Sequence, residues 1–391
     1  MTVREPKIVM TLMVRDEADI IAAMIEHHLA QGVDLIIATD NGSLDGTREI
    51  LADYAATGRL ELHDYLAHDK NQTAVVSGMA SRAATEHGAT WVINADADEF
   101  FLPRDPGLTL RAALRRIPTS LGSFSVPVVN MSGVPARSGP SLARLTLRDV
   151  RDESSLMATV ALHAHPTADI IHVGRAGVVV GQGNHGVDIP SLGKPEPAYA
   201  LEVLHYPWRS YEQYGTKIAN TGRSYDANPT LNPSPRHHGM RDYRFWKAGV
   251  LEPLYLVRHP DLPEDDGFVE DLRVHQGLQS LLESGDAVMP QHLAAAMGGD
   301  VVGYAPDERI AAATVARIVI PLEIEHIEAS TMWRDLYRAE AARHRAASRE
   351  RDTAVGELAR VRSLPVMRAR SLLGRVVRAP KAIVRRLRES I

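Results

Sequence analysis

Residues 91–101 read Trp-Val-Ile-Asn-Ala-Asp-Ala-Asp-Glu-Phe-Phe. The mostly apolar run at 91–95 predicts a buried strand, and Asp96 and Asp98 follow directly at its end. Only the small residue Ala97 separates the two carboxylates, so both can approach one hard cation. Mg²⁺ and Mn²⁺ prefer such oxygen ligands and often join protein carboxylates to substrate phosphates. A solvated acidic turn is the alternative interpretation of an isolated Asp-x-Asp.

The ninety residues that precede this motif alternate between apolar runs and helical patterns. Apolar runs predict strands at 8–14, 33–38 and 60–65, and a 3.6-residue period predicts helices at 17–31, 48–56 and 71–87. Strands that alternate with helices predict βαβ units and a three-layer α/β domain with a mostly parallel sheet. Ligands bind beyond the carboxyl ends of the strands in such sheets. Polar clusters follow three of those ends, at 15–17, 40–45 and 96–99, so we expect them to meet at one edge.

The loop after the second predicted strand reads Asp-Asn-Gly-Ser-Leu-Asp-Gly-Thr, residues 40–47. Its two glycines permit a tight turn, and Asp45 or Thr47 can cap the next helix. That structural account does not require Asp40. A carboxylate at the end of a strand can accept a hydrogen bond from a nucleobase N–H, so we expect Asp40 to bind a nucleotide.

The composition limits the class of protein. The chain has 391 residues, of which 45% are hydrophobic, enough for one large core with a smaller appendage. The sequence has no cysteine, which excludes disulfides and thiolate metal sites. It holds neither an apolar signal-peptide segment nor a run of about 18 apolar residues, so we expect a cytoplasmic protein.

Charge is distributed unevenly along the chain. Residues 331–391 hold 16 Lys and Arg against 6 Asp and Glu, while residues 1–330 hold 28 basic against 43 acidic groups. This contrast predicts a boundary near residue 330. The acidic main body argues against nucleic-acid binding, which requires a basic face.

The C-terminal region carries two further predictions. Residues 331–363 are rich in Ala, Arg and Glu and predict a long exposed helix, which could self-associate as a short coiled coil. Residues 364–391 interleave apolar and basic side chains, a pattern typical of an amphipathic helix on an anionic membrane surface. We therefore expect a peripheral position on the inner face of the membrane. A helix that packs on the acidic body or on a partner is the alternative.

The two motifs together resemble the family 2 glycosyltransferases of the GT-A fold. The closer likeness is to a bacterial subgroup whose metal motif reads Asp-x-Asp-Glu-Phe, here residues 96–100. The stretches that carry the similarity within residues 7–225 are Arg15-Asp16-Glu17, residues 40–47, and His205-Tyr206-Pro207-Trp208-Arg209-Ser210 with Glu212, Gln213 and Lys217. Asn41 stands where the family has a second Asp. The resemblance implies a Rossmann-like three-layer GT-A domain over 1–260. Outside it, sequence pattern and charge predict a helical and loop accessory region over 261–330 and a basic helical tail over 331–391.

The resemblance also implies site residues. The predicted nucleotide-binding set is Arg15, Asp16, Glu17, Asp40, Asn41, Arg209 and Lys217, the last two on the diphosphate as a bidentate clamp and a point charge. The predicted catalytic set is Asp96, Asp98 and Glu99, and Asp96 and Asp98 would hold Mn²⁺ or Mg²⁺. Either His205 or His185, which lies in a Gly-rich loop, could complete the metal shell. Backbone hydrogen bonding is the alternative for both imidazoles.

The catalytic base stays open at this stage. An inverting transferase needs a carboxylate or histidine within reach of the acceptor hydroxyl. The candidates are Glu99, Asp188, Glu212 and the acidic runs at 264–266 and 270–271. The sequence distinguishes neither these groups nor inversion from retention.

We therefore expect a metal-dependent transferase with a nucleotide-sugar donor, first of all a UDP-sugar. The expected acceptor is a glycan, a lipid-linked molecule or another component of the cell envelope. A sugar nucleotidyltransferase, an aspartyl phosphatase and a non-catalytic scaffold on a GT-A body are the alternatives. A phosphatase would have its Asp-x-Asp after the first strand, and a nucleotidyltransferase would have a Gly-rich loop there.

Overall fold

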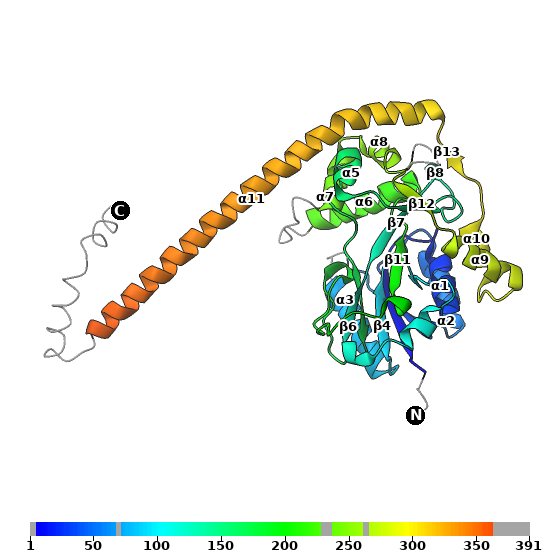
Figure 1. Cartoon of the computed structure of the whole chain (residues 1–391), viewed down its shortest axis with the longest axis horizontal. Helices are drawn as coiled ribbons and strands as arrows, with labels where there is room; N and C mark the ends of the chain where they lie inside the picture. Colours follow the sequence, from blue (N-terminus) through cyan, green and yellow to red (C-terminus); the bar gives the residue numbers. More distant parts are fainter. Residues whose placement is uncertain (1–4, 68–71, 228–236, 261–265, 363–391) are drawn as a thin grey trace. The chain divides into compact units, whose positions relative to one another are not determined.

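The computed structural model describes residues 5–67, 72–227, 237–260 and 266–362 (Figure 1). A six-stranded sheet forms the centre of the first compact unit, residues 1–325, with strand order β3-β2-β1-β4-β10-β6. Its strands are β1 (Ile8–Val14), β2 (Leu35–Asp40), β3 (Leu60–Asp64), β4 (Trp91–Ala95), β6 (Ser123–Val126) and β10 (Asp169–Val173). The first four strands run parallel, and β10 runs antiparallel to both of its neighbours. The predicted α/β class with a mostly parallel sheet is confirmed.

The alternation of side chains along β1 produces the layers of the fold. Met10 belongs to the core on one face of the sheet, which α1 (Ile21–Ala30) and α2 (Thr47–Ala56) cover. Val9 belongs to the core on the other face, which α3 (Gln72–Thr85) covers. Helices therefore lie on both sides of the sheet, as expected for the GT-A arrangement.

A second sheet begins directly after the Asp-x-Asp motif, with strand order β12-β9-β7-β11-β5. Its strands are β5 (Glu99–Pro103), β7 (Val128–Ser132), β9 (Leu147–Asp149), β11 (Leu201–His205) and β12 (Phe268–Glu270). Two buried histidines of α1 satisfy the backbone of β5: His27 Nε2 donates to the carbonyl of Phe101, and His28 Nε2 accepts from its N–H. The motif thus occupies the turn between β4 of the first sheet and β5 of the second.

The remaining helices, strands and turns complete the described chain. They are α4 (Leu110–Leu114), α5 (Glu153–Val160), α6 (Tyr211–Asp226), α7 (His238–Lys247), α8 (Leu251–Leu256), α9 (Arg273–Ser284), α10 (Pro290–Met297), α11 (Pro306–Arg362), the short pair β8 (Ala136–Ser138) and β13 (Val302–Gly303), and 3₁₀ turns at 119–121, 182–184 and 197–199. A second apolar core joins α6, α7, α8 and the first turns of α11 through Ala312, Ala316 and Ile320.

Two apolar runs differ from the simple strands that their sequence suggests. Residues 142–144 form a turn, which Arg144 closes by donating to the carbonyls of Pro140 and Val134. In the apolar run from 170 to 180, the strand ends at Val173; at Gly174 a side chain would collide with the backbone of Ala89, and a turn follows at residues 176–177. In this half of the chain, an apolar run marks buried residues but does not give the length of a strand.

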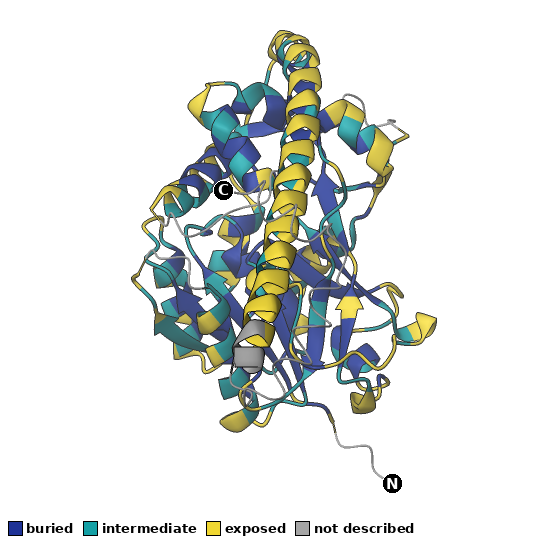
Figure 2. Ribbon diagram, turned by 90° about the vertical axis from the view of Figure 1, so that its left-hand side faces the viewer, coloured by how far each residue is buried: buried dark blue, intermediate teal, exposed yellow. Residues whose placement is uncertain are grey.

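The second compact unit comprises residues 326–391, and its described part is the continuation of α11 to Arg362. Most of its side chains are exposed (Figure 2). The predicted helical extension is confirmed, whereas the predicted domain boundaries and self-association over 331–363 stay predictions. The predicted membrane-surface segment, 364–391, lies outside the described residues. Among the described helices, none combines the length and apolarity required to cross a lipid bilayer.

Candidate active site

Asp98 is the centre of a charged cluster at the carboxyl edge of the first sheet. Its Oδ2 accepts from Lys217 Nζ at 2.6 Å and from Arg209 Nη1 at 3.3 Å, and His205 Nε2 lies 3.6 Å away. Burial alone would raise the pKa of Asp98, but Lys217, His205 and Arg209 together hold it well below its usual range. Asp98 is therefore ionised, and its buried Oδ1 has no hydrogen-bond partner.

Arg209 lies behind this cluster rather than in the pocket. Its side chain has no exposed surface, and its guanidinium donates to Glu17, to both oxygens of Asp19 and to Asp98. These carboxylates occupy the N–H donors of the guanidinium, and a diphosphate would need the same donors. The sequence predicted a direct clamp on the diphosphate, and the structure instead gives Arg209 the role of fixing Glu17 and Asp98.

The loop after β2 places Asp40 as the sequence predicts. Asp40 is buried, and its Oδ2 accepts from the N–H groups of Gly42 and Ser43. Its Oδ1 is buried without a partner. Asn41 donates from Nδ2 to the carbonyls of Tyr65 and Ala67, which fixes the following strand end. The loop therefore leaves one carboxylate oxygen of Asp40 buried and without a partner.

The loop after β1 is tied to its neighbours by Asp16. This residue has a positive φ of 55°, its N–H donates to Ser43 Oγ, and its carboxylate accepts from the N–H of Leu44 and from Asn220 Nδ2. A non-glycine residue in the left-handed region is held there by its surroundings. Asp16 thus joins the loops after β1 and β2 to helix α6.

A pocket of about 240 Å³ opens between these loops and α6. Its lining includes the predicted residues Arg15, Asp16, Glu17, Asn41 and Lys217. Lys217 is about one-third exposed and links Asp98 to Glu17 at 2.6 and 3.3 Å, which raises the pKa of its ammonium although burial alone would lower it. The pocket therefore presents a permanent positive charge beside the Asp-x-Asp motif.

The other two acidic residues of the motif are held by hydrogen bonds. Asp96 accepts from Asn184 Nδ2 at 3.1 Å, and its own N–H donates to Glu99 Oε2 at 2.9 Å. Burial and the charge of Asp98 raise the pKa of Asp96 to about 6. Burial and the charge of Asp169 raise the pKa of Glu99 well above its usual range. Glu99 therefore closes the turn as a neutral group.

The two candidate histidines have separate surroundings. His205 is the last residue of β11; its Nδ1 donates to Asn130 Oδ1 at 2.9 Å, and its Nε2 lies 3.6 Å from Asp98 Oδ2. His185 lies in the loop 181–186, and its Nδ1 donates to Asp169 Oδ1 at 3.1 Å. Only His205 faces the Asp-x-Asp motif as a metal ligand would.

The four predicted metal ligands do not form one group. Within the described ranges, no cluster of three or more His, Asp and Glu side chains is arranged to hold a metal ion. The reason is that Asn184 engages Asp96 and Asp169 engages His185. The unpartnered Oδ1 of Asp98 and the lone pair of His205 still fit a divalent cation, which commonly binds carboxylate and imidazole together.

Several residues of the site did not emerge from the sequence. Asp169, Asn184 and Asp19 are the acidic and amide groups that hold His185, Asp96 and Arg209, and Asn220, Thr221 and Ser224 of α6 line the pocket. Asp169 precedes an apolar run, so it would be recognised only if β10 were known to run antiparallel to β4. In that orientation its first residue lies at the edge where β4 ends.

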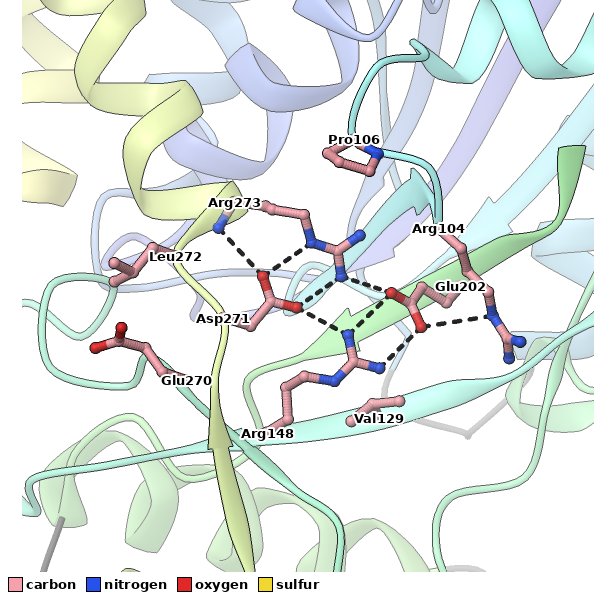
Figure 3. Close-up of a pocket in the computed structure, with 9 residues that line it drawn as sticks. All are labelled: Arg104, Pro106, Val129, Arg148, Glu202, Glu270, Asp271, Leu272 and Arg273. Carbon is pink, nitrogen blue, oxygen red and sulfur yellow. Dashed lines mark hydrogen bonds and ion pairs between the residues drawn. The ribbon is translucent and has the colours of Figure 1, made fainter. Parts of the chain in front are cut away.

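A larger cavity, about 720 Å³, opens on the second sheet and is filled by ion pairs (Figure 3). Arg148 and Arg273 both donate to Glu202 and Asp271, and Arg104 lies 3.7 Å from Glu202. The network links β9, β11 and α9, and it joins three arginines to two carboxylates. Asp271, a predicted alternative for the base, is therefore a structural partner of two arginines.

Comparisons with known proteins agree with part of this description. Residues 9–138 match the model of Glycosyltransferase family 92. No curated protein matches the sequence. Among solved structures, the chain is similar to Staphylococcus aureus TarS 1–349 in complex with UDP, with 15% identity over 83% of this chain and 91% of that chain and a TM-score of 0.32. The complex of the same protein with UDP-GlcNAc gives 12% identity, coverage of 80% and 90%, and a TM-score of 0.33. A mycobacterial protein gives 13% identity, coverage of 60% and 81%, and a TM-score of 0.26.

The family match corrects one prediction. The resemblance to family 2 is wrong, because the model that matches is that of family 92. The match extends from β1 through the motif to β8 and shows that the protein is a transferase of the glycosyltransferase class. The structural similarities have TM-scores too low to bear on the substrate.

Proposed function

We propose that the protein transfers a sugar from a nucleotide-sugar donor in a reaction that depends on a divalent metal. A UDP-sugar is the first donor to test, and the proposed acceptor is a glycan, lipid-linked or other cell-envelope molecule. One observation carries the proposal: the 240 Å³ pocket joins the loops after β1 and β2 to the ammonium of Lys217. A nucleoside diphosphate requires polar partners at one end and positive charge at the other.

The base would lie near the free Oδ1 of Asp40, which can accept a nucleobase N–H. The diphosphate would lie beside Lys217, which contributes a point charge. Arg209 contributes indirectly, since it fixes the carboxylates of Glu17 and Asp98. The donor would thereby be aligned along the carboxyl edge of the sheet, where α/β proteins bind ligands.

Asp98 and His205 are the residues that would hold Mn²⁺ or Mg²⁺. When bound, the cation neutralises charge on the leaving diphosphate, which is worth several kcal/mol of transition-state stabilisation. Lys217 would share this role, because it contacts the same carboxylate oxygen. The preformed positive charge in a partly buried site avoids reorganisation during the reaction.

A thermal-shift titration tests the proposal with UDP, GDP and dTDP, each with and without Mn²⁺. A ligand that binds only the folded protein raises its apparent stability by about 2.7 kcal/mol at 100 times its Kd. We expect Mn²⁺-dependent stabilisation by one nucleotide that is lost in Asp98→Asn. Asp53→Asn is the matched control, because Asp53 is an exposed aspartate paired with His292.

This titration tests the scaffold alternative, and an assay of UTP consumption tests the nucleotidyltransferase alternative. A scaffold built on this fold would show no stabilisation by any nucleotide, with or without metal. A sugar nucleotidyltransferase would consume UTP together with glucose 1-phosphate and release pyrophosphate. Either result would replace the proposed transfer reaction.

A further inference from the structure

His185 forms a pair with a buried carboxylate. Its Nδ1 donates to Asp169 Oδ1 at 3.1 Å, and the Asp169 side chain has no exposed surface, whereas that of His185 is 40% exposed. The backbone of Ala168 also forms a hydrogen bond with the imidazole. The ring is therefore held by the protein on one side, and its exposed part is accessible to a ligand.

The loop that carries His185 is built to keep this position. The N–H of Gly181 donates to the carbonyl of Gly186, and the N–H of Val180 donates to Ser77 Oγ of α3. Gly183 has a φ of 70°, and a side chain there would lie 3.0 Å from the His185 ring. Asn184 contacts Asp96. His185 thus lies next in sequence to a residue that touches the Asp-x-Asp motif.

The carboxyl group of Glu99 lies close to the pair formed by His185 and Asp169. Burial and the charge of Asp169 raise the pKa of Glu99 well above its usual range. Burial also raises the pKa of Asp169, and its hydrogen bond with His185 opposes that shift. The hydrogen bond with Asp169 is also the main reason that the pKa of His185 is raised.

Three of the acidic residues considered from the sequence as bases, Asp188, Asp271 and Glu99, are engaged elsewhere. Glu264 and Asp265 lie outside the described residues. Asp188 is paired with Arg175 and accepts from the N–H of Val179. Asp271 belongs to the arginine network of Figure 3, and Glu99 closes the turn after Asp96. Glu212 is exposed in the first turn of α6.

We propose that His185 is the general base of the transfer reaction and that Asp169 is its positioning residue. The inference rests on the proposed function above. The acceptor oxygen attacks the anomeric carbon, its proton passes to Nε2 of His185, and the bond from that carbon to the diphosphate oxygen breaks with its electron pair. One displacement of this kind inverts the anomeric configuration. Asp169 holds the correct tautomer and stabilises the imidazolium that forms.

The closing experiment uses water and azide as acceptors, because water must lose a proton and azide need not. UDP release is measured for UDP-glucose, UDP-galactose and UDP-N-acetylglucosamine with the full-length wild type, His185→Ala, Asp169→Asn and His292→Gln. His292→Gln is the matched control, since His292 forms a surface pair with Asp53. We expect His185→Ala to lower hydrolysis about 100-fold or more. Azide should restore UDP release in this variant and give an inverted glycosyl azide.

Stabilisation by UDP and Mn²⁺, together with the rate and stereochemistry of the reaction, distinguishes a general base from a metal or donor ligand. Stabilisation by UDP and Mn²⁺ should survive in His185→Ala, whereas its loss would make His185 a metal or donor ligand and overturn the inference. Hydrolysis close to the wild-type rate, or a retained configuration, would overturn it as well. A wild type that binds and hydrolyses none of the donors would overturn the proposed function itself.

An NMR titration of the histidine resonances measures the effect of Asp169 on the pKa of His185 and requires no activity assay. The groups that act on His185 are Asp169 of β10, Asp96 at the end of β4 and Glu99, through Asp169, on β5. Asp169→Asn should lower the pKa of His185 and shift the acidic limb of the pH–rate profile to lower pH. An unchanged His185 titration in Asp169→Asn would overturn the positioning role.

Discussion

The ammonium nitrogen of Lys217 lies 2.6 Å from Oδ2 of Asp98, and this contact joins helix α6 to the turn after β4. The two residues are 119 positions apart in the sequence, yet the charge of one determines that of the other. Lys217 holds the pKa of Asp98 well below its usual range even though burial alone would raise it. In the proposed function, this pair would supply both the positive charge for the diphosphate and the negative charge for the metal.

Replacing Lys217 by Met should weaken nucleotide binding. The variant removes the point charge that faces the pocket, so we expect the affinity for UDP to fall by about 10-fold or more. Calorimetric titration with UDP and Mn²⁺ measures the change. Lys247→Met, at the exposed end of α7, provides the control. Equal UDP affinity in the Lys217→Met variant and the wild type would show that the ammonium does not face the diphosphate.

Replacing Arg209 by Leu should mainly destabilise the fold. Removing one partner of a buried ion cluster leaves carboxylates uncompensated and costs about 3–5 kcal/mol. Urea denaturation measures the free energy of unfolding, and Arg244→Leu is a milder comparison because Arg244 is 40% exposed. A variant that keeps wild-type stability but loses UDP binding would restore the direct clamp predicted from the sequence.

Asp40→Asn should impair recognition of the nucleobase without affecting the diphosphate. The amide keeps the size of the side chain but has only one oxygen, which the N–H groups of Gly42 and Ser43 require. We expect UDP to bind about 10-fold more weakly or worse, since a hydrogen bond left unmade costs about 1–3 kcal/mol. Binding of inorganic pyrophosphate with Mn²⁺ should be unchanged. Parallel loss of both ligands would contradict a base-specific role.

Acid should destabilise the protein through the histidines of α1. Burial lowers the pKa of His27 from 6.5 to about 4, and it lowers that of His28 well below 6.5. Between pH 6.5 and 4 the unfolded chain binds protons that the folded chain excludes, so stability is complete above pH 6.5 and falls as the pH decreases. The shift of His27 alone corresponds to about 3 kcal/mol by pH 4.

Urea denaturation at pH 7, 5.5 and 4.5 tests this linkage. His27→Gln should reduce the slope of stability against pH, while His344→Gln, an exposed residue of α11, should leave it unchanged. His28→Ala should also cost about 2–4 kcal/mol at pH 7, because it removes the buried acceptor of the Phe101 N–H. A His27→Gln variant with the wild-type slope would assign the acid sensitivity to other groups.

Truncation should distinguish the two parts of α11. A chain that ends at residue 325 keeps Ala312, Ala316 and Ile320 in the second core, so its melting temperature should remain near that of the full chain. A chain that ends at residue 305 removes these contacts and should melt at a clearly lower temperature. Circular dichroism measures both transitions. Equal melting of the two truncated chains would show that the start of α11 adds no stability.

Local pattern determined much of this protein. The strand at Ile8–Val14 and the strand before Asp96 have the predicted bounds, and the α/β class follows from their alternation with helices. The predicted residues Asp98 and Lys217 meet beside the pocket. Such features follow from short-range periodicity and from the rule that parallel strands end at a common edge.

Tertiary structure alone decided which charged groups meet. Arg209 became a buried partner of Glu17 and Asp98, and His185 paired with Asp169 instead of joining His205 at the motif. Partners far apart in sequence are selected by strand direction and by the depth of burial, and neither is encoded in local periodicity. The antiparallel direction of β10 brings Asp169 to the edge of the sheet, and only the folded chain fixes that direction.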